Sequence, residues 1–278
     1  MQTALLIEQV LNGLQFGVML FLMAAGLTLI FGVMGVINLA HGSLYMIGAF
    51  ACAAVAMATG SFWLGLLASL AAAAAAGALV ELLVIRRLYH RDHLDQVLAT
   101  FALILIFSEG TRWLFGSFPL YLDIPPLLSG AIDLPGGARY QLYRLAIIVV
   151  GLGVAIGLYL LIAKTRLGMR IRAGESDREM IAALGVNIRA LYTAIFALGA
   201  ALAGLAGAMV GALQSVQVGM GEPVLILAFV VIVIGGLGSL EGALVGALIV
   251  SAVRTAGVQF FPEVELALAG LLIDLEED

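Results

Sequence analysis

Residues 164–189 read KTRLGMRIRAGESDREMIAALGVNIR and form the longest charged run in an otherwise apolar chain. Within this run, Ser176 and Glu179 have the S-x-x-E spacing of a capping box, in which the Ser hydroxyl accepts a hydrogen bond from the backbone N–H three residues later. Apolar residues then recur at helical spacing: Met180, Ile181 and Leu184. Gly185 follows where a helix commonly ends in a left-handed turn. The pattern predicts a short helix that starts at Ser176 and lies between two long apolar segments.

About two turns of helix are not stable alone in water, so the predicted helix needs something to pack against. The spacing leaves two interpretations open. In one, the segment is a surface loop that turns back onto its own membrane bundle. In the other, it is a docking helix whose apolar stripe fits a groove in a soluble partner.

The composition indicates a membrane protein. Hydrophobic residues make up 63% of the 278 residues and charged residues 11%, and the mean hydropathy is +1.14. A soluble domain is typically about half apolar and a quarter charged. Cys52 is the only cysteine, which excludes an intrachain disulfide and a thiolate metal site. No basic region precedes the first apolar segment, so no cleavable signal peptide is expected.

The apolar runs predict an all-α polytopic bundle of about eight spans, because a bilayer core requires roughly 20 residues. The expected spans are 10–31, 44–57, 63–85, 97–115, 142–163, 191–213, the run after Glu222, and 242–258. Glycine-rich breaks interrupt the apolar pattern at 32–43 and 235–239, which indicates broken helices. The whole chain, 1–278, is predicted to be one domain, with a Pro/Gly-rich loop at 116–141.

The basic residues predict the orientation in the membrane. Nine of the 13 Lys and Arg residues lie at 86–91 and 164–189. Two expected spans separate these clusters, so both lie on one side, which the positive-inside rule makes the cytoplasm. The charged loop 164–190 is then cytoplasmic, and both the N-terminus and the 116–141 loop are outside.

The glycine-rich breaks contain polar residues that are candidates for a functional role within the spans. Gly42-Ser43-Leu44 recurs as Gly238-Ser239-Leu240, which is either a trace of an internal repeat or chance in a chain with 34 glycines. Asn38 and His41 precede the first triplet. A polar or ionisable side chain at membrane depth is a functional candidate. The alternative is that both side chains satisfy backbone groups that the glycines leave free.

Several segments resemble one transporter family. They are GLTLIFGVMGVINLAHGSLYMIGAF (26–50), ELLVIRRLYH (81–90), LATFALILIFSEGTRWLFG (98–116), KTRLGMRIRAGESDREMIAALGVN (164–187) and VIVIGGLGSLEGALVGALI (231–249). In this order they resemble the permease subunits of ABC importers for branched-chain amino acids, over about residues 8–262. That family also includes permeases for urea and short amides, and these segments do not separate the substrates.

The resemblance implies a multi-pass protein of the bacterial inner membrane, surrounded by lipid and with no nucleic-acid partner. It implies a second permease subunit, two cytoplasmic ATP-binding subunits and a periplasmic substrate-binding protein. ATP is then bound and hydrolysed by the partners, so this chain is not an enzyme and has no catalytic residue, metal or cofactor of its own. Substrate would cross by alternating access.

The resemblance also implies two sets of functional residues. The loop would carry the coupling helix that docks on an ATPase; its residues loosely match an E-A-A-x-x-x-G pattern, with a shorter glycine spacing. The expected coupling residues are Ser176, Arg178, Glu179, Met180, Ala182, Ala183, Leu184 and Gly185. The expected translocation-path residues are Asn38, His41, Gly42, Ser43, Gly235, Gly236, Gly238 and Ser239.

Two other classes of transport protein stay open from the residues alone. A secondary transporter driven by an ion gradient needs a buried acidic group, and only Glu81 and Glu109, both near span ends, are available. Glu109 and Arg112 are expected to pair, because they lie three residues apart on one helix. A channel is the other alternative. The last apolar run, 266–273, is too short to cross a bilayer, so the side on which the chain ends stays open.

Overall fold

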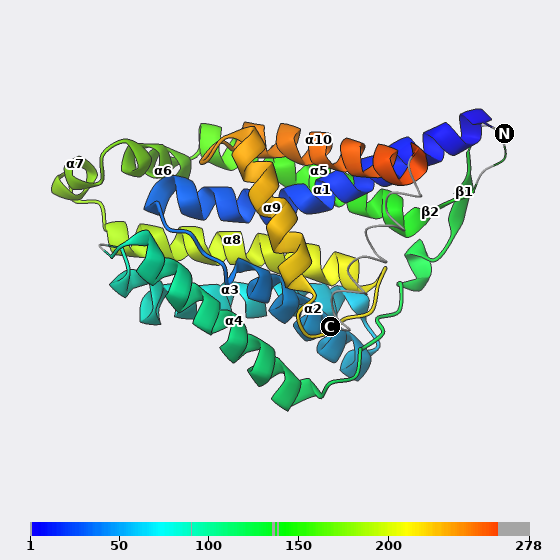
Figure 1. The fold of residues 1–278 in the computed structure, drawn as a ribbon, viewed down its shortest axis with the longest axis horizontal. Coiled ribbons are helices and arrows are strands. Elements are labelled where there is room, and N and C mark those ends of the chain that lie inside the picture. Colours follow the sequence, from blue (N-terminus) through cyan, green and yellow to red (C-terminus); the bar gives the residue numbers. More distant parts are fainter. Residues whose placement is uncertain (1, 90, 135–136, 138, 261–278) are drawn as a thin grey trace, which may run out of the picture.

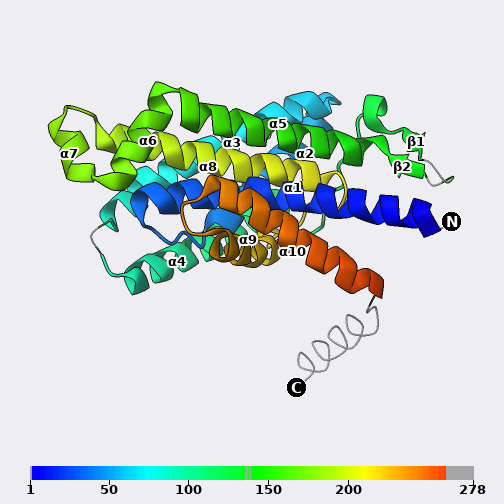
Figure 2. The same ribbon diagram turned by 90° about the horizontal axis from the view of Figure 1, so that it is seen from above.

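Two long helices, α1 (Gln2–Met34) and α8 (Ile188–Gly211), lie side by side at the centre of the computed structural model (Figures 1 and 2). The structure describes residues 2–89, 91–134, 137 and 139–260. Both central helices are predominantly apolar and largely buried, as expected of helices in the middle of a bundle. The other helices pack around this pair.

The remaining helices are α2 (His41–Thr59), α3 (Phe62–Leu83), α4 (His93–Phe115), α5 (Leu142–Lys164), α6 (Arg166–Ser176), α7 (Arg178–Ala183), α9 (Gly221–Gly235) and α10 (Leu240–Phe260). Short 3₁₀ turns lie at η1 (Ile85–Arg87) and η2 (Pro126–Leu128). One antiparallel pair, β1 (Ala131–Asp133) and β2 (Arg139–Gln141), is the only sheet among the described residues. Ile132 lies opposite Tyr140 in this pair.

Within the described part of the chain, seven helices are long and apolar enough to cross a membrane. They are α1, α2, α3, α4, α5, α8 and α10, with η1 continuing α3. The eighth apolar segment is α9, which has 15 residues and is therefore only about 23 Å long. The prediction of an all-α polytopic bundle is confirmed, and one of the eight expected spans is a short helix. The expected apolar run at 266–273 lies outside the described residues.

Small residues set the close packing of α2, α3 and α8. A Cβ atom on Gly48 would lie 2.6 Å from the carbonyl oxygen of Gly204, so a larger residue at Gly48 would force α2 away from α8. The Ser69 hydroxyl of α3 donates a hydrogen bond of 2.8 Å to the same carbonyl. Glycine and serine at such contacts are typical of helices that associate within lipid.

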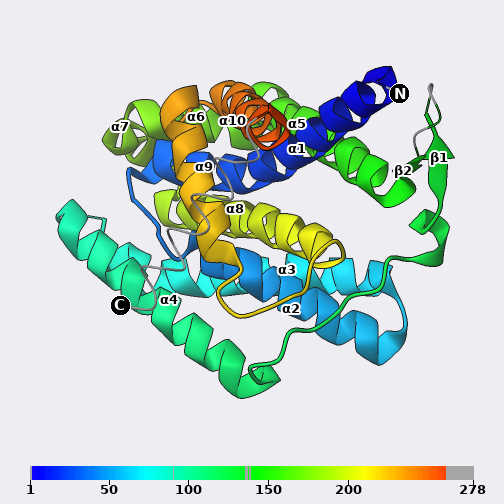
Figure 3. The same ribbon diagram turned by 45° about the vertical axis from the view of Figure 1, so that its right-hand side comes forward.

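The helices α1–α3 and α8–α10 have the same arrangement in opposite directions. Each set starts with a central helix, α1 or α8, followed by a loop that returns into the bundle (residues 35–40 or 212–220) and a helix that begins there, α2 or α9. The third helix of each set lies antiparallel to the central helix of the other set: α3 against α8, and α10 against α1. The helices α2 and α9 begin beside each other, since a Cβ on Gly42 would lie 2.8 Å from the carbonyl oxygen of Gly221. Figure 3 shows α9 crossing in front of the bundle. Such inverted repeats are common in transporters.

The two ends of the bundle differ in charge and in structure. The end with η1, α6 and α7 carries both basic clusters and is called the basic end here (left in Figure 1). The opposite end carries the 116–141 loop, in which Leu120 pairs with Val216 of the α8–α9 connection. The exposed pair Glu109–Arg112 also lies there, at the end of α4, as predicted.

Candidate functional site

The charged loop at the basic end holds two helices, whereas the sequence pattern predicted one. The first, α6, runs to Ser176, and the side chain of Thr165 caps its start by accepting the Gly168 N–H. The N-cap of α7 is Asp177, whose Oδ1 accepts the Met180 N–H at 2.9 Å. The predicted start at Ser176 is therefore wrong by one residue. Asp is as good an N-cap as Ser, but with the cap at Asp177 the third helical residue is Met180, so the helix does not use the S-x-x-E capping box.

The three apolar residues expected to form a stripe are Met180 and Ile181 of α7 and Leu184, which directly follows α7, and they do not form one surface. Ile181 is 6% exposed and lies against α6, next to Met169 and Arg170. Met180 and Leu184 are 59% and 75% exposed. The expected stripe is therefore divided: one residue holds α7 on α6, and two face solvent. Ala182 and Ala183 are also exposed, and α7 forms the tip of the basic end (Figures 1 and 2).

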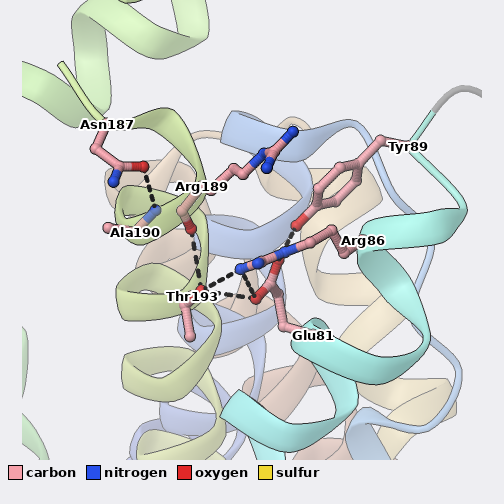
Figure 4. Close-up of polar contacts among 7 residues, drawn as sticks. All are labelled: Glu81, Arg86, Tyr89, Asn187, Arg189, Ala190 and Thr193. Atoms are coloured by element: carbon pink, nitrogen blue, oxygen red, sulfur yellow. Dashed lines mark hydrogen bonds and ion pairs between the residues drawn. The ribbon is translucent and has the colours of Figure 1, made fainter. Parts of the chain in front are cut away.

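The turn after α7 passes directly into the central helix α8. Gly185 has φ +84°, which confirms the left-handed turn predicted there. Residues 184–187 then join α7 to α8. Asn187 caps α8 by accepting the Ala190 N–H at 3.0 Å, drawn in Figure 4. A force on α7 has therefore only a short path into the centre of the bundle.

A buried carboxylate fixes the start of α8 to the end of α3 (Figure 4). Glu81 of α3 is fully buried and forms a two-point ion pair with Arg86, at 3.1 Å to Nε and 2.9 Å to Nη2. The Thr193 hydroxyl of α8 donates to the same carboxylate at 2.7 Å and the Tyr89 hydroxyl at 2.5 Å. Burial and the bond to Glu81 raise the pKa of Tyr89, so this hydroxyl stays protonated and donates.

The sequence pattern does not predict this cluster. By position along the chain, Glu81 is an acidic residue near a span end and Arg86 belongs to a basic cluster. Glu81 and Thr193 are 112 residues apart, so no local spacing connects them. The available signal was an acidic residue followed after five positions by Arg86, which η1 brings back onto α3.

The first break of the bundle places four predicted path residues in the centre. The loop 35–40 returns from the basic end, and Asn38, His41, Gly42 and Ser43 are all buried. No hydrogen-bond partner for the Asn38 amide occurs among the described residues, so the interpretation in which this side chain satisfies free backbone groups is wrong. Gly42 lies where α2 and α9 meet, whereas the His41 imidazole lies against Gly26 of α1.

The second break lies elsewhere, at the basic end. Gly238 and Ser239 line a crevice of about 390 Å³ between α1, α5, α6 and the α9–α10 turn. Ser239 caps α10 by accepting the Gly242 N–H at 2.9 Å, and Gly236 and Gly238 have positive φ. The two Gly-Ser-Leu triplets are therefore not equivalent in the structure. The counterpart of Gly42 in the repeat is Gly221, at the start of α9.

The chain is similar to known transport proteins over nearly its whole length. A family model described as "Branched-chain amino acid transport system / permease component" matches residues 9–275. A high-affinity branched-chain amino acid transport system permease protein, BraD of Pseudomonas aeruginosa, is 31% identical to this chain. The aligned region covers 96% of this chain and 92% of BraD. The high-affinity branched-chain amino acid transport system permease protein LivH of Escherichia coli is 28% identical, and the aligned region covers 87% of this chain and 83% of LivH. No solved structure matches the chain.

Proposed function

Because the chain belongs to the family of branched-chain amino acid transport permeases, we propose that it forms the membrane path of an ATP-driven importer for these amino acids. The chain is a multi-pass membrane permease. The observation that supports ATP coupling is α7, a short helix at the tip of the basic end, with Met180 exposed on it and Leu184 exposed directly after it. An exposed apolar pair four residues apart suits insertion into a groove of a partner.

The partners in this proposal are two cytoplasmic ATP-binding subunits, a sister permease and a substrate-binding protein outside. The basic end faces the cytoplasm, as the positive-inside rule requires. ATP-driven closure of the two ATP-binding subunits moves α7. The linker 184–187 and the Glu81 cluster then carry this movement into α8 and α3 together, because the cluster prevents α8 from sliding along α3.

An ion-coupled carrier is the weaker candidate. It requires an acidic group that can release and bind an ion within the membrane. Glu81 is held by Arg86, Tyr89 and Thr193. Glu109 is exposed at the end of α4 and paired with Arg112. The relatives are named for branched-chain amino acid transport, which favours these substrates over urea and short amides.

The test is whether a charge on α7 removes the ATP-binding subunits. Leu184→Asp places a carboxylate in the docking surface, and we expect at least a tenfold loss of co-purified ATP-binding subunits in mild detergent, because an unpaired charge cannot be buried in an apolar groove. Leu127→Asp is the matched control, since Leu127 is also 75% exposed but lies in the loop at the opposite end. Equal recovery of the ATP-binding subunits with both variants would refute the docking role.

A further inference from the structure

A cavity of about 670 Å³ opens at the end of the bundle opposite α7. It lies between the first half of α1, the α8–α9 connection, the start of α9 and the second half of α10. Its volume is in the range typical of sites for small molecules, roughly 300–1,000 Å³. None of the residues predicted for the translocation path lines it.

The charge of this cavity is positive. Arg144 and Arg254 line it, and no acidic side chain does so among the described residues. Arg144 donates to two neutral groups, Asn12 Oδ1 at 2.7 Å and Gln141 Oε1 at 3.3 Å. The Arg254 guanidinium lies 4.3 Å from the centre of the Phe16 ring, and the described part of the chain offers it no ion pair. Two uncompensated guanidinium groups facing one cavity favour an anionic group there.

The buried part of the cavity lining is mostly apolar, with two polar groups, the Gln15 amide and the Tyr45 hydroxyl. Tyr45 comes from the first turns of α2 and is 1% exposed, and its hydroxyl has no hydrogen-bond partner among the residues described. It lines the cavity together with Leu20, Leu213 and Leu227. A buried hydroxyl without a partner costs free energy unless a ligand or water satisfies it. The cavity thus combines cationic groups, an apolar wall and a free buried hydroxyl.

We propose that this cavity receives the amino acid as it enters the membrane path, with the Arg254 guanidinium binding the α-carboxylate and the apolar wall contacting the side chain. The inference rests on the proposed function, because it takes an amino acid as the substrate. Arg254 is assigned over Arg144 because Arg144 already donates to Asn12 and Gln141, whereas the planar face of Arg254 stacks on Phe16 and leaves its N–H donors for a carboxylate. The Tyr45 hydroxyl donates a hydrogen bond to the amino acid in the buried part of the cavity.

The experiment compares uptake of leucine with uptake of leucinamide, which lacks the carboxylate, into vesicles that contain the whole importer and its substrate-binding protein. We expect Arg254→Gln to lower leucine uptake at subsaturating substrate about tenfold or more, the loss expected when a charged hydrogen bond is removed, and to leave leucinamide uptake nearly unchanged. The substrate-binding protein is identical in each assay, so a change in the leucine-to-leucinamide ratio arises in the permease. Arg254→Lys keeps the charge and should restore part of the ratio.

Arg139→Gln is the matched control, because Arg139 is an exposed arginine at the same end but outside the cavity. A leucine-to-leucinamide ratio that is the same for Arg254→Gln, Arg139→Gln and the unaltered protein would overturn the site. Recovery of the ATP-binding subunits with Arg254→Gln shows that the assembly is intact. If the unaltered assembly imports no leucine under any condition, the proposed function fails, and the site assignment fails with it.

Discussion

At the scale of single residues, the ion pair of Glu81 with Arg86 ties α3 to η1 through a fully buried carboxylate. Its carboxylate is fully buried, and Arg86, Tyr89 and Thr193 all donate to it. Glu81→Gln removes the negative charge and leaves Arg86 without its counterion. The expected cost is about 1.5–3 kcal/mol, which lowers the apparent Tm in detergent by roughly 3–12 °C.

The control for this prediction is Glu109→Gln, the same change in a pair that is exposed. The Glu109 and Arg112 side chains are 67% and 48% exposed, and exposed pairs contribute only about 0–1 kcal/mol. We therefore expect its apparent Tm to stay close to that of the unaltered protein. If Glu81→Gln and Glu109→Gln had the same apparent Tm, the Glu81 cluster would not hold α3 to α8.

At the scale of elements, the contact between the starts of α2 and α9 determines how the two repeats fit together. Gly42→Ala adds one methyl group where a Cβ would lie 2.8 Å from the carbonyl oxygen of Gly221, so the helices must separate. Overpacking of this kind costs about 1–3 kcal/mol, and we expect a lower apparent Tm and slower transport. In α5, a Cβ at Gly153 meets nothing within 4 Å, so Gly153→Ala should be neutral or slightly stabilising. A Gly42→Ala protein as stable as Gly153→Ala would contradict the close contact.

The elements also show how far local sequence patterns reach. Hydropathy predicted the long helices, because a run of about 20 apolar residues has few other uses. It did not predict that the loop 35–40 turns back into the bundle, since GVINLA is as apolar as the helices beside it. The start of α7 was misplaced because Ser176 and Asp177 can both cap a helix. The left-handed turn at Gly185 could be predicted, because a positive φ at the end of a helix favours glycine.

At the scale of the whole molecule, the interactions that the sequence could not predict are those between distant segments. Glu81 and Thr193 lie on different helices, as do Gly42 and Gly221, and Tyr45 joins Arg254 at one cavity only through the packing of α1, α2 and α10. No periodicity within one helix encodes such pairs. The charge distribution, by contrast, can be counted along the chain, and it predicts how the whole bundle is oriented.

That orientation can be tested directly, because Cys52 is the only cysteine in the sequence and is buried. In a Cys52→Ala background, Ser129→Cys places a thiol in the exposed loop opposite α7, and Ser176→Cys places one at the exposed end of α6, next to α7. A membrane-impermeant maleimide added to intact spheroplasts should label position 129 and should reach position 176 only after the membrane is opened. This expectation follows from the positive-inside rule, because nine of the Lys and Arg residues lie in the two basic clusters at that end. Labelling of position 176 but not 129 in intact spheroplasts would reverse the orientation, place α7 outside and remove any contact with cytoplasmic ATP-binding subunits.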